Sequence, residues 1–322
     1  NTVTFNGTQA TVTAATKSRL EVTVPLAATS GPIAVTGTGG SATSPQAFTV
    51  GAVAPAIGSV SASSADPDAA ITITGQRFDP APSRNNVTIN GTFAEVTAAS
   101  ASALQVRVPP AGVASGPVVV ETPEGRDVGP DLFIPPAAGL TTASLGATAR
   151  MAIGAQQVVS QTTAGKHALV VFSGTKGQRV AIRSQSSFSP FGTLALYGPN
   201  GKPIGAYPGA SITNGGFFDS VTLPDTGSFT MHLSPIVGRT GTVTLSLYDV
   251  APDTRGEIEP SGPPVAVANT TPGQNHHLTF EGTPGQRVSL EATGLTYGSG
   301  LGAYISIRGP DGASIVQPAF AS

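Results

Sequence analysis

One stretch decides the fold, because the chain contains it twice. It reads Val-Thr-Phe-Asn-Gly-Thr at residues 3–8 and Val-Thr-Ile-Asn-Gly-Thr at residues 87–92. β-branched and aromatic residues favour strands, and an Asn-Gly pair between two strands is the strongest short-range signal of a hairpin. We therefore expect a β-hairpin at each of the two positions.

The similarity continues downstream of both hairpins. Leucine and valine alternate with polar residues at 20–25, a stretch that ends in proline, and the same pattern returns at 104–109. Ser-Gly-Pro-Ile at 30–33 likewise matches Ser-Gly-Pro-Val at 115–118. Strict alternation indicates half-buried strands, and proline ends them because it cannot donate to a ladder. These are two copies of one β module.

The two copies differ at their front. The second is preceded by residues 55–85, which include Ile-Thr-Ile-Thr-Gly at 71–75 and then Phe78. The first copy has no equivalent segment. We therefore expect a partial domain at 1–52 and a complete one at 53–136, and we expect the chain to be a fragment of a longer protein.

The second half of the chain repeats a different unit. Gly-Thr-Lys-Gly-Gln-Arg-Val at 174–180 returns as Gly-Thr-Pro-Gly-Gln-Arg-Val at 282–288, and Gly-Pro-Asn-Gly at 198–201 returns as Gly-Pro-Asp-Gly at 309–312. Proline and glycine preset the backbone angles of turns. We expect one β-sandwich at 137–252 and a second, truncated one at 253–322.

Two proline-rich stretches separate these units. Pro-Pro-Ala-Ala-Gly at 135–139 lies between the two kinds of module, and residues 253–264 contain three prolines and mixed charge. Proline-rich linkers are semi-rigid. We predict short, stiff spacers at both places.

Both repeats resemble known families. The order Thr-Ile-Thr-Gly-x-x-Phe, Asn-Gly, Leu-x-Val-x-Val-Pro and Ser-Gly-Pro resembles the IPT/TIG immunoglobulin-like domain, in full over about 55–135 and in part over 1–50. The second unit is similar to the pre-peptidase C-terminal (PPC) domain through Thr-Pro-Gly-Gln-Asn at 271–275 and the later Gly-Gln-Arg-Val. It also looks like sandwich repeats of large bacterial RHS-type proteins with YD repeats. The resemblance implies a jelly-roll-like sandwich.

Composition supports an all-β fold and narrows the range of partners. Glycine (40) and proline (28) are frequent, and only 11% of the residues are charged. With a net charge of −2 and scattered basic residues, no basic face for nucleic acid or an anionic membrane is expected. No run of about 18 apolar residues occurs, so we expect no membrane insertion of this segment.

Cysteine is absent. A disulfide framework, a thiolate metal site and a cysteine nucleophile are thereby excluded. Together with the low charge and the Thr-, Ser- and Gly-rich strands, this composition is typical of exported bacterial proteins. We expect an extracellular or cell-surface location.

The histidines do not form a recognisable metal site. We interpret all four as exposed polar residues of strands: His167, His232, His276 and His277. The adjacent pair at 276 and 277 would point to opposite faces of a strand, so the two rings could not easily bind one metal. No metal and no cofactor is predicted.

Acidic and basic side chains carry three weaker hypotheses. Asp66 with Asp68, and Glu257 with Glu259, could each contribute to a Ca²⁺ site, but two carboxylates alone are a poor set of ligands, and we favour solvated turns. Asp219 follows Gly-Gly-Phe-Phe, which indicates a β-bulge with the aspartate closing a loop. The four lysines could in principle form isopeptide bonds, but no acid and asparagine partners are recognisable: Lys17, Lys166, Lys176 and Lys202.

The aromatic residues divide into two groups. Core packing is expected for phenylalanines at strand positions: Phe78, Phe133, Phe172 and Phe280. The candidates for a sugar-facing surface are tyrosines of the second kind of module: Tyr197, Tyr207, Tyr297 and Tyr304.

These observations favour a structural role over catalysis. No Gly-x-Ser-x-Gly elbow occurs in a strand–turn–helix setting, so no catalytic residue is predicted and the chain is interpreted as not an enzyme. We expect spacer, adhesion or assembly modules of a secreted or surface protein, contacting other domains of the same longer chain, other copies in extracellular fibres, or surface proteins and glycans. The alternative is a glycan-binding accessory module of a secreted hydrolase.

Overall fold

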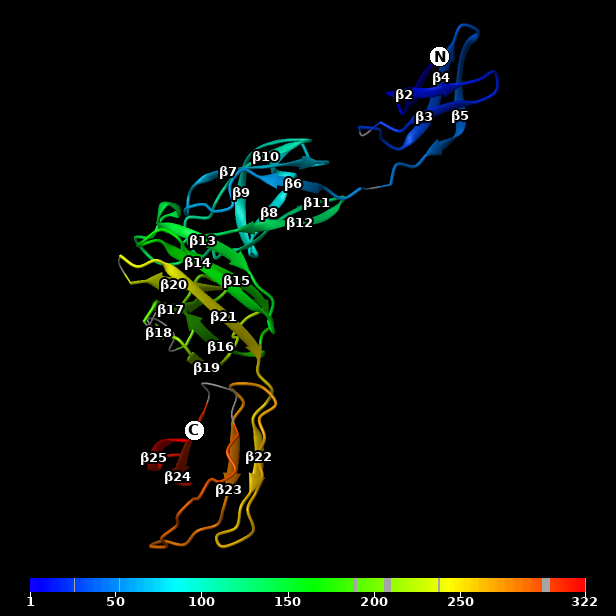
Figure 1. Cartoon of the computed structure of the whole chain (residues 1–322). Helices are drawn as coiled ribbons and strands as arrows, with labels where there is room; N and C mark the ends of the chain where they lie inside the picture. The colour runs from blue at the N-terminus through cyan, green and yellow to red at the C-terminus, as the bar shows by residue number, and fades with distance from the viewer. Residues whose placement is uncertain are drawn as a thin grey trace.

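The structure is a computed structural model of the whole chain, and it describes residues 1–25, 27–51, 53–187, 190–205, 210–236, 238–296 and 302–321. Figure 1 shows four groups of strands that follow one another in a row. The helices among the described residues are two short 3-10 turns, η1 (Pro82–Arg84) and η2 (Thr142–Ser144). The predicted all-β fold of tandem sandwich modules is confirmed.

The first unit is one antiparallel sheet of five strands in the order β3-β2-β1-β4-β5. Its strands are β1 (Thr2–Phe5), β2 (Thr8–Ala15), β3 (Leu20–Thr23), β4 (Gly31–Gly37) and β5 (Gly40–Phe48). Its buried core is small, because among the residues described there only Val3, Phe5, Ala10 and Ala28 are largely shielded from solvent.

The second unit repeats this sheet and adds two strands, in the order β12-β11-β8-β9-β10-β7-β6. Its strands are β6 (Ala56–Val60), β7 (Ala70–Gln76), β8 (Asn86–Ile89), β9 (Thr92–Ser100), β10 (Ala103–Arg107), β11 (Gly116–Thr122) and β12 (Gly125–Leu132). The alternating residues predicted to face the core do so, since Leu104 and Val106 are at most 1% exposed. Phe78 is buried as predicted.

Both predicted hairpins are present. Asn6 and Gly7 have φ of 46° and 89°, and Asn90 and Gly91 have φ of 46° and 80°. Two successive residues with positive φ form the turn whose twist matches antiparallel strands, and asparagine and glycine adopt that backbone at the lowest cost. Each hairpin joins the first two strands of the repeated sheet.

The third unit is a sandwich of two sheets, ordered β13-β15-β20-β17-β18 and β14-β21-β16-β19. Its strands are β13 (Leu145–Arg150), β14 (Gln156–Gln161), β15 (His167–Gly174), β16 (Arg179–Ser186), β17 (Gly192–Tyr197), β18 (Ala210–Ile212), β19 (Gly216–Thr222), β20 (Gly227–Pro235) and β21 (Gly241–Asp249). The two inner faces form the largest core of the chain. Within it Phe172 stacks on Phe229, with ring centroids 5.4 Å apart.

The last segment corrects two predictions. Residues 253–264 are not only a linker, because they contain β22 (Thr254–Glu257), which pairs in parallel with β23 (His276–Thr279). The pair of β13 and β15 in the third unit is likewise parallel. The remaining hairpin consists of β24 (Ala303–Arg308) and β25 (Ser314–Ala321).

Core packing of this segment differs from that of the third unit. Phe280 is 38% exposed, whereas Phe172 at the matching position is fully buried, so its predicted core role is wrong. Val288 and Leu290 are likewise exposed, although the matching Val180 and Ile182 are buried. In the third unit β15 pairs with β20, and β16 pairs with β19 and β21; no strands matching β19, β20 and β21 occur among the described residues of 253–322.

Candidate functional site at the joint between the second and third units

The β8–β9 hairpin of the second unit reaches a strand of the third. The Nδ2 of Asn90 donates to the carbonyl of Ser228 over 2.9 Å, and the backbone N–H of Ser228 donates to Oδ1 of Asn90 over 3.0 Å. The side-chain amide thus extends the end of β20 as a strand backbone would. Asn90 and Ser228 are separated by 138 residues in the sequence, so these bonds fix two domains relative to each other.

The hairpin presents Asn90 because a glycine leaves room for its side chain. A Cβ on Gly116 would lie 2.7 Å from the Cβ of Asn90, closer than real Cβ atoms come to other atoms. The glycine of the repeated Ser-Gly-Pro motif therefore has a steric function. Gly31 has the same relation to Asn6 in the first unit, with a closest approach of 2.4 Å.

An ion pair crosses the joint beside this contact. The guanidinium of Arg150 in β13 donates to both carboxylate oxygens of Asp131 in β12, over 2.5 and 2.6 Å. It also donates to the hydroxyls of Ser173 and Ser228. The hydrogen bonds with Asp131 raise the pKa of Arg150, and a two-pronged geometry of this kind adds orientation as well as energy.

Apolar contacts fill the space between the two units. Phe133 packs against Leu169 and Val171, both fully buried, and against Leu145. Leu169 and Val171 lie on the face of β15 opposite to the sandwich core, which Ala168 and Val170 face instead. The outer face of this sheet is therefore covered by the second unit. The predicted burial of Phe133 is confirmed, at the joint between two domains.

The connecting chain is held on both sides. The carboxylate of Asp66 accepts from the backbone N–H of Thr142 over 2.6 Å and from its hydroxyl over 3.2 Å. Pro135 is buried, and Ile134 before it exchanges two hydrogen bonds with the hydroxyl of Ser115. The predicted spacer at 135–139 is thus pinned between two packed domains.

A histidine pair lies on the same outer face. The Nδ1 of His167 and the Nε2 of His232 are 2.9 Å apart, with one ring donating and the other accepting, and the rings stack. His232 is 7% exposed, so the expectation of an exposed histidine is wrong there. Burial, and then the neighbouring His167, lowers the pKa of His232 to about 4. Burial also lowers the pKa of His167.

The other two histidines lie in β23. The Nδ1 of His276 contacts the hydroxyl of Thr254, and His277 lies with its Nε2 3.6 Å from a carboxylate oxygen of Asp253. The two histidines therefore have different partners, which is expected because neighbouring residues of a strand point to opposite faces. Among the described residues, no group of three or more histidine or acidic side chains could hold a metal ion.

The acidic residues predicted as turn positions have defined partners. Asp68 accepts two hydrogen bonds from Arg107, which lower its pKa, while Asp66 belongs to the joint. Glu257 and Glu259 are exposed. The pairing of β16 with β19 shifts register next to Asp219, as the predicted bulge requires, and Oδ1 of Asp219 accepts from the N–H of Ser220.

The lysines considered for isopeptide bonds and the tyrosines considered for a sugar-facing surface do not form a common site. Lys166 donates to the carbonyl of Ala143. Tyr197 lies near His232, with ring centroids 6.3 Å apart, whereas Tyr304 is 74% exposed on β24. Tyr207 and Tyr297 lie outside the described residues. Across the described part of the chain, no helix is long and apolar enough to cross a membrane.

The residues that build the joint were not predicted from the sequence. Asn90 was identified only as a turn residue, and Asp131, Arg150 and Ser228 were not singled out. Their side chains meet only after two domains have folded, so no local pattern marks them. The one available signal was the outward position of Arg150 and Ser228 on strands whose other face is apolar.

Comparison with solved structures finds several similar proteins. One is the pre-peptidase C-terminal domain of a collagenase from Bacillus anthracis, at 14% identity over 31% of this chain and 93% of that chain, with a TM-score of 0.26. Another is a surface glycan-binding protein from Prevotella bryantii, at 11% identity over 77% of this chain and 90% of that chain, with a TM-score of 0.31. A third is a periplasmic inhibitor of g-type lysozyme from Aeromonas hydrophila, at 13% identity over 32% and 99%, with a TM-score of 0.24.

Family comparison agrees with the repeat described above. No curated protein matches the sequence. Residues 55–132 match the family described as the IPT/TIG domain, and this range contains all strands from β6 to β12. Residues 55–132 are therefore an IPT/TIG domain.

Proposed function

We propose that this chain is a non-enzymatic structural and interaction segment of a secreted or cell-surface protein, in which the second and third units form one stiff element. The observation that carries this proposal is the joint, where hydrogen bonds, a two-pronged ion pair and a buried phenylalanine act together. A spacer transmits orientation only if its domains do not swivel. Interfaces between domains of one chain permit relative motion unless they are well packed.

The energetics support stiffness. Burial of a phenylalanine side chain contributes about 1.5–3 kcal/mol. An exposed ion pair contributes about 0.2–1 kcal/mol, but Asp131 is only 12% exposed and its carboxylate accepts two bonds from one rigid guanidinium. Because all these contacts break together when the domains separate, their energies act jointly against swivelling.

Distance measurement between two spin labels tests the proposal. The chain has no cysteine, so Ser102→Cys and Thr240→Cys, at exposed positions of the second and third units, provide two unique attachment points. We expect a narrow distance distribution that broadens when Phe133→Ala and Arg150→Ala are added. Arg126→Ala, on β12 outside the joint, is the matched control and should leave the distribution narrow.

Two outcomes would contradict the proposal. A broad distribution in the unmodified joint would mean that the contacts do not hold the domains. A distribution left unchanged by the double substitution would mean that the named residues do not provide the stiffness. Membership of an RHS-type protein and assembly into extracellular fibres stay predictions, and electron microscopy of the protein from its source would check both.

Glycan binding is the alternative, and its candidate is the outer face where Tyr197 lies beside the histidine pair. Tyr197 is half-buried there, so it offers an aromatic edge and not an open stacking platform. Titration with soluble polysaccharides, followed by tyrosine fluorescence, would check this alternative. A response abolished by Tyr197→Ala and unchanged by Tyr304→Ala would favour a glycan site on this face.

A further inference from the structure

The two sheets of the third unit have four edge strands, β13, β14, β18 and β19, and only some of these edges are protected against pairing with another chain. Edge strands are usually protected by shortness, by charge or by a bulge. Strand β18 has three residues, β13 ends at Arg150, and β19 contains Asp219 and pairs with a register shift. Strand β14 reads Gln-Gln-Val-Val-Ser-Gln at 156–161, without charge, proline or glycine, and its register with β21 is continuous. None of the usual protective features therefore occurs in β14.

The backbone of β14 offers hydrogen-bonding groups at its free edge. Ser160 lies opposite Thr242 of β21, and Thr242 uses its own N–H and C=O for bonds to Ser187 on the far side of β21. In an antiparallel ladder, opposite residues either exchange hydrogen bonds or both point away from each other, and the two kinds of pair alternate. Ser160, Val158 and Gln156 therefore direct their N–H and C=O groups away from β21. Among the described residues, no strand pairs with β14 on that side.

The centre of this edge has an uncovered apolar side chain beside a carbonyl that lacks a strand partner. The carbonyl of Val158 accepts a hydrogen bond from the Nε2 of Gln157 over 2.8 Å, so a side chain occupies the place of a strand N–H. The side chain of Val158 is 56% exposed on the outer face, whereas Val159 is buried in the sandwich core. Both the backbone and the side chain of Val158 are thus available to a further strand.

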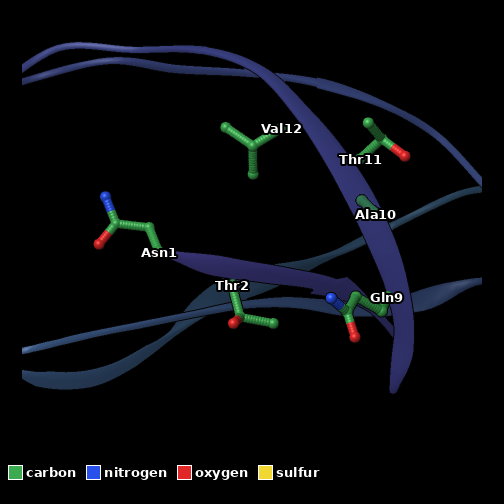
Figure 2. A pocket seen from close by; sticks show the side chains of 6 residues that line it. All are labelled: Asn1, Thr2, Gln9, Ala10, Thr11 and Val12. Atoms are coloured by element: carbon green, nitrogen blue, oxygen red, sulfur yellow. The ribbon is translucent and has the colours of Figure 1, made fainter.

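The neighbouring edge does not close off β14. A hollow of about 220 Å³ lies between β13 and β14, which do not pair with each other, and small side chains such as Ala147 and Ala149 contribute to its lining. A hollow of about 470 Å³ over β1 and β2 differs, because those two strands pair with each other and leave no free edge between them. Figure 2 shows the residues that line this second hollow: Asn1, Thr2, Gln9, Ala10, Thr11 and Val12.

We propose that β14 is a self-association edge, at which two copies of the chain pair antiparallel about a two-fold axis through Val158. In this register Val158 of one copy lies opposite Val158 of the other, and Gln156 lies opposite Ser160. The two exposed valines cover each other, and amide side chains meet hydroxyls, so each pair is favourable and no like charges meet. A second copy fits this edge because the uncharged strand is complementary to itself.

The contact joins two four-stranded sheets into one continuous sheet, with β14 of each copy at its centre. A two-fold contact is closed, so it gives a dimer and not a fibre. One strand of six residues from each copy forms an interface smaller than the standard about 1,200–2,000 Å², so the association is weak and reversible. It is independent of the joint between the second and third units.

Analytical ultracentrifugation of the full chain between about 10 μM and about 1 mM tests the association, and a reversible monomer–dimer equilibrium is expected. Val158→Lys places two lysines opposite each other at the axis, and the dissociation constant should rise at least about tenfold. The fold is retained because Val158 is exposed in the single chain. Thr222→Lys is the matched control: it adds the same charge at an exposed position of β19, the opposite edge of the same sheet, and should dimerise as the unmodified chain does.

Cysteine cross-linking tests the register, because the chain has no cysteine of its own. Val158→Cys should give a disulfide-linked dimer, since directly opposite Cα atoms lie about 5.5 Å apart and a disulfide spans about 4.4–6.8 Å. Gln156→Cys should not cross-link with itself, because its two copies lie four positions apart along the strands, roughly 13 Å, but it should cross-link with Ser160→Cys. A chain that stays monomeric up to about 1 mM, equal dimerisation of the Val158→Lys chain, or self-cross-linking of Gln156→Cys as efficient as that of Val158→Cys would overturn the proposal.

Discussion

The buried histidine pair leads to a prediction about acid stability. His232 is neutral in the folded protein down to low pH, because burial, and then the adjacent His167, lowers its pKa to about 4. In the unfolded chain its pKa returns to about 6.5. Between these two values the unfolded state binds the proton and the folded state does not. Stability therefore rises with pH in this window: it is fully present above pH 6.5 and is lost as the pH falls towards 4.

The size of the effect follows from the same values. The pKa difference of about 2.5 units, from about 6.5 to about 4, corresponds to up to about 3 kcal/mol at about 1.36 kcal/mol per unit. The aspartates with lowered pKa, Asp68, Asp79 and Asp253, have an ordinary value of 3.8 and titrate below it. Their contribution is therefore lost at lower pH than the histidine effect.

Urea unfolding at several pH values measures this loss. The chain has no tryptophan, so Phe217→Trp in β19 gives a fluorescence signal specific to the third unit. We expect the free energy of unfolding to fall by up to about 3 kcal/mol between pH 7 and 4, and His232→Gln to remove most of the slope. His167→Gln should keep most of it, because burial is the larger cause. A flat profile, or equal slopes in both variants, would refute the reasoning.

Two further substitutions test the packing. Thr230→Val should raise the free energy of unfolding by about 1 kcal/mol, because the hydroxyl of Thr230 is buried with no hydrogen-bond partner among the described residues; a loss of stability in thermal unfolding would contradict this. Gly75→Ala should destabilise the second unit by at least about 1–3 kcal/mol, since the added Cβ would lie 2.1 Å from the carbonyl of Ala56. Gly39→Ala, in open space, is its control, and equal unfolding midpoints would show that the site relaxes freely.

The strands could be predicted because their signals are local. The Asn-Gly pairs specify a turn with two positive φ values, and alternation specifies which side chains face the core. The second copy of the module added evidence for the same strands that a single copy would not provide. The assignment of residues 253–264 to a linker was wrong because β22 is short and rich in charge. Such a sequence is typical of a loop, and only the parallel pairing with β23 identifies it as a strand.

The joint could not be predicted because its residues contact one another only across two separate units of the chain. In β20 the inward Phe229, Met231 and Leu233 alternate with Ser228, Thr230 and His232, and this pattern is typical of a strand with one solvated face. The alternation assigned the faces correctly. What it could not show is that Phe133 of the second unit covers Leu169 and Val171 on the outer face of the neighbouring strand β15, and that His232 stacks with His167 on the same face.

The two hairpins show that the repeated module has nearly the same local structure whether or not it takes part in the joint. Asn6 and Asn90 adopt the same turn, and Gly31 and Gly116 clear the same space for their side chains. Yet Asn6 donates to the hydroxyl of Thr29 within its own unit, whereas Asn90 bonds to Ser228 of the next. Because the turn favours asparagine in both copies, the specificity of the joint resides in the residues around it: Asp131 of the second unit, and the backbone of Ser228 and the guanidinium of Arg150 in the third. The module supplies a preformed contact, and its neighbour determines whether that contact becomes a joint.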